Sequence, residues 1–394
     1  MPTLPRPLAS RLPQVGTTIF SVMSSLAAKH GAVNLGQGFP DFDCDPRLVH
    51  EVSAAMEAGH NQYSPMAGVP ALRQAIAAKI ASLYGHEYSP ETEITVTAGA
   101  TQAILTAILA VVQPGDEIIV LEPAYDSYVP NIELAGGIPV RLPLGGSGLP
   151  GDFRPDLSKV AQAITPRTRA ILINSPHNPS GTVWSAAEML RLQEILAPTD
   201  VLVISDEVYE HMVYDGARHQ SVARFPGLAA RAFVISSFGK TYHATGWKVA
   251  YSAAPDYLMA EFRKVHQFNV FAVNTPMQHG LAAYMADPAP YLALPAFYQG
   301  KRDRFRAGLA RTRFKLLPAE GTYFQCLDYS ELAMPEARLG DGEFCQWLTT
   351  EIGVAAIPLS AFYGSGLDQG VIRFCFAKRD ETLGIALERL GRVV

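Results

Sequence analysis

Residues 201–209 are Val-Leu-Val-Ile-Ser-Asp-Glu-Val-Tyr, an apolar run that ends in a carboxylate. A short, continuously apolar and β-branched run is typical of a strand buried on both faces of a parallel sheet. The carboxylate that follows it, Asp206, is costly to bury unless a cation or a hydrogen-bond donor pairs with it. The stretch therefore predicts an α/β fold with a functional acid at the end of a strand. A nucleotide-binding acid and a metal ligand are the alternatives for Asp206 from these residues alone.

Similar runs alternate with longer helical stretches from about residue 48 to residue 285, which is typical of α/β proteins. The clearest are residues 93–97, 117–121, 169–174, 232–236 and 247–252. After Pro288 a long helical segment continues through Phe297 and Arg311 into a smaller α+β region, with strand-like residues 322–327 and 371–376. We expect an N-terminal arm and part of a small domain in residues 1–47. A large domain is expected in residues 48–287, and an interdomain helix with the rest of the small domain in residues 288–394.

Composition narrows the class of protein. The 394 residues fit two or three domains, and 48% hydrophobic residues support a large core. A net charge of -5, from 32 basic and 37 acidic side chains, argues against a nucleic-acid-binding surface. The longest apolar run, residues 103–112, is too short to span a membrane, so no membrane partner is expected. Four cysteines without a C-x-x-C pair argue against a disulfide framework and a zinc site and fit the cytoplasm.

The N-terminal segment needs a separate test because Arg6 and Arg11 precede a mildly apolar stretch, as in a secretory signal. Residues 17–28, however, contain several Ser and Thr residues, and Ile19, Val22, Met23 and Leu26 recur at helical spacing. That spacing favours an amphipathic helix.

Polar residues gather where the predicted strands end, which is where ligands bind in an open parallel sheet. Residues 98–101, Ala-Gly-Ala-Thr, join a strand to a helix. They form either a socket for an anion or a plain turn with Thr101 as N-cap. Tyr125 follows residues 117–121 and is suited to stack on a flat ring, although a partly buried core tyrosine is the alternative.

Two further strand ends carry chemistry. Residues 175–181, Ser-Pro-His-Asn-Pro-Ser-Gly, predict a rigid loop that directs Asn178. Lys240 follows residues 232–236, and desolvation there lowers a lysine pKa and makes the amine a nucleophile for carbonyls. A surface lysine is the alternative, but the serines and glycines around Lys240 favour the nucleophile. Residues 146–151 match a dinucleotide-binding pattern, but they open no apolar helix and predict a loop.

Taken in order, these segments resemble the class I/II group of fold-type-I, pyridoxal-phosphate-dependent aminotransferases. The resemblance covers about residues 34–378, nearly the whole chain. Its most specific pieces are residues 34–41, 61–63, 176–181, 205–209, 237–240 with 246–248, and 372–377. Bacterial methionine aminotransferases and kynurenine/glutamine aminotransferases are the most similar groups. Many relatives have arginine where this chain has Lys248, whose compact ammonium neutralises phosphate without two-pronged geometry.

The resemblance implies a mostly parallel, seven-stranded-type sheet flanked by helices, with pyridoxal 5'-phosphate as the cofactor. Lys240, Asp206 and Tyr209 are the implied catalytic residues. Lys240 joins the cofactor aldehyde and moves the substrate proton, Asp206 pairs with the ring nitrogen, and Tyr209 with Asn178 contacts the phenolic oxygen. The other implied cofactor contacts are Gly99, Ala100, Thr101, Tyr125, Ser237, Lys248 and, from a neighbouring subunit, Tyr63. The implied substrate contacts are Arg373, Asn178 and Gly38 for the carboxylate, and Ile19, Phe39, Tyr63 and Phe271 for the side chain.

By this resemblance the protein is a cytoplasmic homodimer with shared active sites. It moves the amino group of an apolar, sulfur-containing or aromatic L-amino acid, methionine first, to a 2-oxo acid by a ping-pong mechanism, without a metal. The alternatives are a kynurenine/glutamine-type transaminase and a cysteine-S-conjugate or cystathionine β-lyase. We do not expect a cofactor-sensing regulator, since the matching segment begins by residue 34 and leaves no room for an added DNA-binding region.

Overall fold

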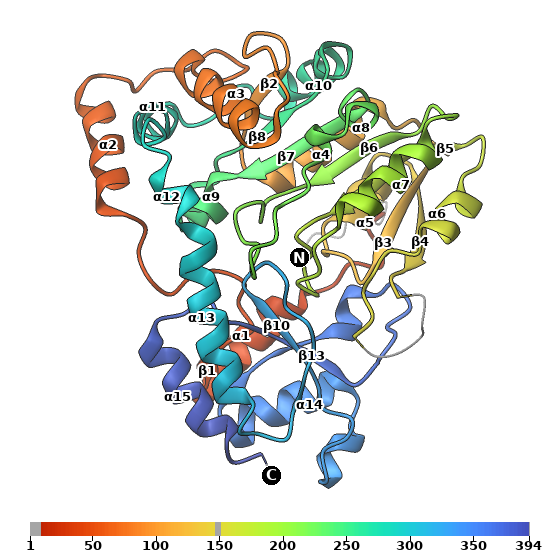
Figure 1. Ribbon diagram of the computed structural model, residues 1–394, viewed down its shortest axis with the longest axis vertical. Coiled ribbons are helices and arrows are strands. Elements are labelled where there is room, and N and C mark those ends of the chain that lie inside the picture. The colour runs from red at the N-terminus through yellow and green to blue at the C-terminus, as the bar shows by residue number, and fades with distance from the viewer. Residues whose placement is uncertain (1–8, 146–150, 394) are drawn as a thin grey trace, which may run out of the picture.

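The computed structural model describes residues 9–145 and 151–393, and a seven-stranded sheet forms its centre (Figure 1). The strand order is β2-β8-β7-β6-β5-β3-β4. Strand β8 runs antiparallel to both of its neighbours, and the other pairs are parallel. The strands are β2 (Ile94–Thr97), β3 (Glu117–Glu122), β4 (Ile138–Pro143), β5 (Thr168–Asn174), β6 (Leu202–Asp206), β7 (Ala232–Ser237) and β8 (Ala250–Ala253). The predicted α/β class with a mostly parallel, helix-flanked sheet is confirmed.

Helices cover both faces of this sheet, because successive side chains of a strand point to opposite sides. In β3, Ile118 and Val120 belong to one buried cluster and Ile119 belongs to the other. The first cluster lies under α4 (Ala100–Val111), α5 (Tyr128–Leu134) and α10 (Asp256–Asn269). The second lies under α3 (Pro70–Tyr84), α6 (Leu157–Ala163), α7 (Ala186–Leu196), α11 (Thr275–Tyr284) and α12 (Ala289–Leu292). Helices α2 (Pro46–Glu57), α8 (Pro226–Ala229) and α9 (Phe238–Thr241) complete this part of the chain.

A second group of elements combines both ends of the chain. Helix α13 (Leu294–Leu309) runs from the large sheet towards it (Figure 1). Its four-stranded antiparallel sheet has the order β12-β13-β10-β9, and a parallel pair joins β1 to β11. The elements are α1 (Ile19–His30), β1 (Val33–Asn34), β9 (Lys315–Leu316), β10 (Phe324–Asp328), α14 (Asp341–Trp347), β11 (Val354–Ala355), β12 (Ile357–Pro358), β13 (Val371–Cys375) and α15 (Asp380–Leu390). The division of the chain at residues 47 and 287 stays a prediction.

Three local predictions need correction. The strand expected at 247–252 begins only at Ala250, because Thr245–Trp247 form a 3-10 turn and Lys248 has a left-handed backbone, φ 55. Helix α4 starts at Ala100 with Gly99 as its N-cap, so Thr101 lies inside the first turn. The helical segment after Pro288 is two helices, α12 and α13, and it ends at Leu309. The amphipathic helix predicted near the N-terminus is confirmed as α1.

The loop predicted at residues 146–151 lies almost wholly outside the described residues. Within residues 9–145 and 151–393, no helix has the length and apolar character needed to cross a lipid bilayer.

Candidate active site

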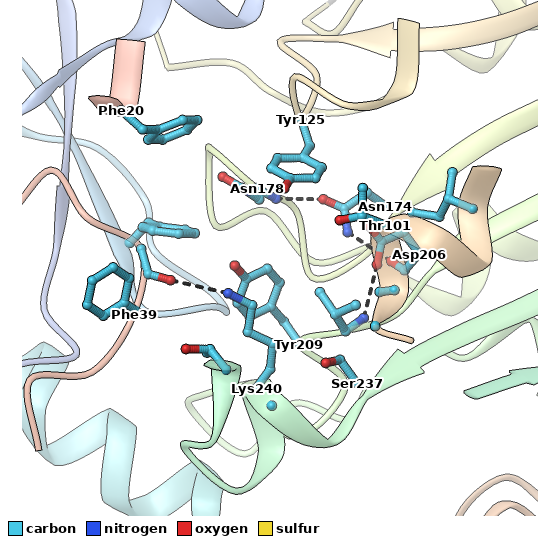
Figure 2. A pocket seen from close by; sticks show the side chains of 18 of the residues that line it. Phe20, Phe39, Thr101, Tyr125, Asn174, Asn178, Asp206, Tyr209, Ser237 and Lys240 are labelled. Atoms are coloured by element: carbon cyan, nitrogen blue, oxygen red, sulfur yellow. Dashed lines mark hydrogen bonds between the residues drawn. The ribbon is translucent and has the colours of Figure 1, made fainter. Parts of the chain in front are cut away.

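A cavity of about 230 Å³ opens at the carboxyl ends of β5, β6 and β7, between the large sheet and the second group of elements (Figure 2). Segments far apart in the sequence meet there, including α1, the start of α4 and strand β13. The predicted site residues that line the cavity are Gly38, Phe39, Gly99, Ala100, Thr101, Tyr125, Asn178, Asp206, Tyr209, Ser237, Lys240, Lys248 and Arg373. The rule that ligands bind beyond the carboxyl ends of parallel strands therefore locates the cavity correctly.

Asp206 ends strand β6 and is buried. Its carboxylate accepts a hydrogen bond from the Tyr128 hydroxyl at 2.6 Å and one from the Val208 N–H at 3.2 Å. Burial raises the pKa of Asp206 to about 6, although these two donors and the nearby Lys240 act to lower it. No group of three or more His, Cys, Asp or Glu side chains that could hold a metal occurs among the described residues.

Lys240 lies in the short helix α9, directly after β7. Its amine donates hydrogen bonds to the Tyr323 hydroxyl at 2.9 Å and to the Gly38 carbonyl at 3.2 Å (Figure 2 shows the second bond). Burial lowers the pKa of Lys240 to about 8, outweighing the nearby Asp206, which raises it. A lysine that lines a cavity with a lowered pKa is suited to act as a nucleophile and a base, and the surface-lysine alternative is not what the structure shows.

The start of α4 forms a cradle for an anion. Gly99, the N-cap, has φ 87 and no side-chain cap, so the first N–H groups of the helix lack a capping partner. A Cβ at Gly99 would lie 2.9 Å from Lys248 Cε and 3.0 Å from its Nζ, so only glycine lets this ammonium approach so closely. Thr101 and Ser237, which carry hydroxyl groups, also line the cavity. Helix N–H groups, hydroxyls and an ammonium together suit a phosphate.

Arg373, on β13, is 1% exposed and lines the cavity. Its Nη1 donates to Asn178 Oδ1 at 2.6 Å and its Nη2 to the Gly36 carbonyl at 3.2 Å, while Nε has no partner among the described residues. The guanidinium also lies 3.9 Å from the centre of the Phe324 ring. Both acceptors are neutral, and a buried guanidinium with an unused N–H group is suited to bind a carboxylate.

Asn178 is fixed through its backbone as well as through the side-chain contact with Arg373. Its N–H donates to Asn174 Oδ1 at 2.7 Å, and the peptide bonds preceding Pro176 and Pro179 are cis (Figure 2 shows the Asn174 contact). The loop of residues 175–181 is buried throughout. The two prolines and this hydrogen bond fix Asn178 at the cavity, as the sequence predicts.

This set of residues fits pyridoxal phosphate. All of the following line the cavity: Asp206 would supply an acid for the ring nitrogen, Tyr125 an aromatic face, Lys240 an amine for the aldehyde, and the α4 cradle donors for the phosphate. Nη1 and Nη2 of Arg373 each keep a second N–H group for a ligand of opposite charge.

Three predicted side-chain contacts do not line the cavity of this chain. Ile19 packs against the hydrophobic core, and its neighbour Phe20 forms the cavity wall instead. Tyr63 is 82% exposed and meets Phe271 edge-on, with ring centres 5.1 Å apart. The roles given to these three residues stay predictions.

Several contacts at the site are absent from the sequence predictions. Tyr128 and Asn174 contact Asp206, Tyr323 contacts Lys240, and Phe20 and Phe324 form apolar walls. Tyr128 follows Tyr125 by three residues, a spacing that could have pointed to it. Nothing near Tyr323 in the sequence connects it with Lys240, because only the packing of the two parts of the chain brings them together.

Comparison of the sequence with known proteins identifies its family. The sequence profile of the family described as Aminotransferase class I and II matches residues 30–390. The chain is 51% identical to methionine aminotransferase of Escherichia coli over 385 residues, which is 98% of each chain. It is 43% identical to the probable N-succinyldiaminopimelate aminotransferase DapC of Mycobacterium tuberculosis over 97% of each. It is 35% identical to kynurenine–oxoglutarate transaminase 1 of Rattus norvegicus, over 98% of this chain and 97% of that protein.

Solved structures give the same result for the fold. A crystal structure of an Escherichia coli protein identified as a methionine aminotransferase matches with a TM-score of 0.94 and 50% identity. The match covers 99% of this chain and 100% of that one. The chain therefore belongs to the class I and II aminotransferases.

Proposed function

We propose that this aminotransferase takes the amino group of an apolar or sulfur-containing L-amino acid, methionine first, and passes it to a 2-oxo acid. The main observation behind this proposal is that Arg373 and Lys240 line the same cavity, together with the apolar side chains of Phe20, Phe39 and Phe324. The 51% identity to a methionine aminotransferase supports the choice of donor. Arg373 is the only arginine among the described residues of this chain that line the cavity, so within this chain a single guanidinium faces the substrate.

Aminotransferases of this family use pyridoxal 5'-phosphate, which supplies an electron sink for the bond that breaks at Cα. In our proposal Arg373 and Asn178 bind the substrate carboxylate and so fix the orientation of Cα. Lys240 would take the proton from Cα as a base and give it back as an acid. Asp206 would keep the ring nitrogen protonated, and Tyr209 would hydrogen-bond the phenolic oxygen. The α4 cradle, with Thr101, Ser237 and Lys248, would hold the phosphate.

We also propose a homodimer in which Tyr63 serves the neighbouring active site. Exposed aromatic side chains support it. Tyr63 is 82% exposed and packs on Phe271, and Phe268, three residues before Phe271, is 90% exposed. Exposed aromatic groups of this kind are typical of interaction surfaces. The four cysteines are free thiols, which supports a reducing compartment such as the cytoplasm.

The test is an activity matrix of amino acids against 2-oxo acids with the purified protein, using Lys240→Ala as the blank. We expect methionine to be the best donor, phenylalanine and kynurenine to be weaker, and aspartate and N-succinyldiaminopimelate to be poor. Parallel double-reciprocal lines are expected for a ping-pong reaction. A matrix with aspartate best and methionine inert contradicts the donor assignment. Pyruvate released from a cysteine conjugate without any 2-oxo acid favours the β-lyase alternative.

A further inference from the structure

Three polar atoms meet next to the reactive amine. The Tyr323 hydroxyl donates to the Gly38 carbonyl at 2.6 Å, and the Lys240 amine donates to both, at 2.9 Å and 3.2 Å. Tyr323 is fully buried and lies just before β10, whereas Lys240 follows β7 of the large sheet. The contact therefore crosses between the two sheets of the molecule.

The proton positions in this triangle follow from chemistry. A carbonyl oxygen only accepts, and a tyrosine hydroxyl has one proton to donate. The bond from Tyr323 to Gly38 is the shortest of the three, which places the tyrosine proton there. Burial raises the pKa of Tyr323 well above its ordinary value, so the hydroxyl keeps that proton at neutral pH. The Tyr323 oxygen then offers its lone pairs to the N–H groups of Lys240.

We propose that Tyr323 is a positioning residue that holds the free amine of Lys240 so that its lone pair faces the substrate. A neutral amine has two N–H groups and one lone pair in a tetrahedral arrangement. Tyr323 and Gly38 lie on the same side of the amine, only 2.6 Å from each other, and accept its N–H groups, which turns the lone pair away from these two oxygens. The arrangement orients the base before it meets the Cα proton.

The inference rests on the proposed role of Lys240 as the base, and the test separates the two. The first measurement uses the full chain without cofactor or substrate. Trace acylation of Lys240 is quantified by mass spectrometry between about pH 6 and 11, which gives the pKa of the amine. The titratable and charged groups near the amine besides Tyr323 are Tyr209, Asp206, Cys375, Arg373 and Lys248, and all of them are kept constant.

We expect Tyr323→Phe to lower the pKa of Lys240 further, because the ammonium loses an acceptor. In the loaded enzyme we expect kcat for methionine to fall about 10- to 100-fold, while KM changes less than about threefold. The isotope effect with methionine deuterated at Cα is expected to rise, since proton transfer becomes slower.

Tyr298→Phe is the matched control. Tyr298 is fully buried and packs on Tyr323 with ring centres 5.7 Å apart, and its hydroxyl has no partner among the described residues. The proposal is overturned if both variants behave alike, or if Tyr323→Phe raises the pKa of Lys240, since a rise means that the hydroxyl donates to the lone pair. If Tyr323→Phe does not fold, 3-fluorotyrosine at position 323 weakens the acceptor and keeps the ring. An unchanged pKa and unchanged kcat with that residue also overturn the proposal.

Discussion

The hydroxyl of Tyr128 donates a hydrogen bond to the carboxylate of Asp206 over 2.6 Å, which joins the start of α5 to the end of β6. Both residues are buried. Burial raises the pKa of Asp206 to about 6, and the Tyr128 bond is the first of the contacts that act to lower it. Tyr128 therefore helps to keep Asp206 charged, and a charged Asp206 is what a protonated ring nitrogen requires.

Tyr128→Phe should raise the pKa of Asp206 above about 6. Below its pKa the carboxylate is neutral and no longer favours the protonated ring nitrogen. We expect the affinity for pyridoxal phosphate at neutral pH to fall about 10-fold, the effect of losing one hydrogen bond to a charged group. The pH at which binding is half lost should move upwards. Titration of the cofactor by absorbance at several pH values measures both quantities.

Tyr88→Phe is a suitable control for this variant. Tyr88 is buried, and its hydroxyl has no hydrogen-bond partner within the described parts of the chain. Equal affinities and equal pH profiles for the two variants would show that the Tyr128 contact has no influence on Asp206.

Arg373→Lys should weaken substrate binding and leave cofactor uptake unchanged. The guanidinium reaches Asn178 and Gly36 and still has N–H groups left for a carboxylate, whereas an ammonium places its three N–H groups on one nitrogen and lacks the two-pronged geometry. We expect kcat/KM for methionine to fall about 100- to 1000-fold, as for other truncated buried charge contacts. Steady-state kinetics measure this loss. The exposed Arg379→Lys, six residues further along the chain, should change kcat/KM less than about twofold, and a normal KM in Arg373→Lys contradicts the assignment.

The local sequence pattern is enough to predict the site residues that follow directly after a strand. Asp206 and Lys240 follow apolar runs, so the rule for parallel sheets places both of them at one edge of the sheet from the sequence alone. The pattern puts Lys248 within or beside a strand, but its left-handed backbone cannot continue one. Strand β4 escapes prediction because it is the partly exposed edge of the sheet and lacks a continuous apolar run. Tyr323 escapes it because its partner is 83 residues away and belongs to another sheet.

Buried histidines should make the fold less stable as the pH falls. Burial lowers the pKa of His211 to about 3 and of His177, His243 and His266 to about 4. Between these values and about 6.5 the unfolded chain binds more protons than the folded chain, so stability is lost as the pH falls through that range. Asp206, whose pKa is raised to about 6, opposes the trend within the same range. Urea unfolding at about pH 7 and pH 5 should give the lower midpoint at pH 5.

His266→Asn tests this dependence at one group. His266 is fully buried, and its Nε2 has no partner in the described structure. Without this imidazole, the unfolding free energy should fall less steeply as the pH falls, by at most about 1.4 kcal/mol per pH unit. An unchanged pH dependence in His266→Asn would contradict the role of burial.

Removal of one partner from the buried ion pair between Lys79 and Glu210 should destabilise the fold strongly. The two side chains are 5% and 1% exposed and their charged atoms lie 2.6 Å apart. Tyr84, Ser236 and Tyr251 also donate to the Glu210 carboxylate. Burial raises the pKa of Glu210, but Lys79, His211 and the hydrogen bonds outweigh burial and hold the pKa well below its ordinary value. Lys79→Met leaves this carboxylate without its cation and should cost about 3–5 kcal/mol of unfolding free energy.

Two comparisons decide whether that cost comes from the unpaired charge. Lys79→Met with Glu210→Gln should be more stable than Lys79→Met alone, because neither partner is then left charged. Arg191→Met breaks an exposed pair, Arg191 with Glu194 at 2.8 Å, and should cost less than about 1 kcal/mol. All variants are compared by urea unfolding at neutral pH. A double variant as unstable as the sum of its single variants means that the pair is not coupled, and the loss in Lys79→Met then reflects packing of the lysine stem.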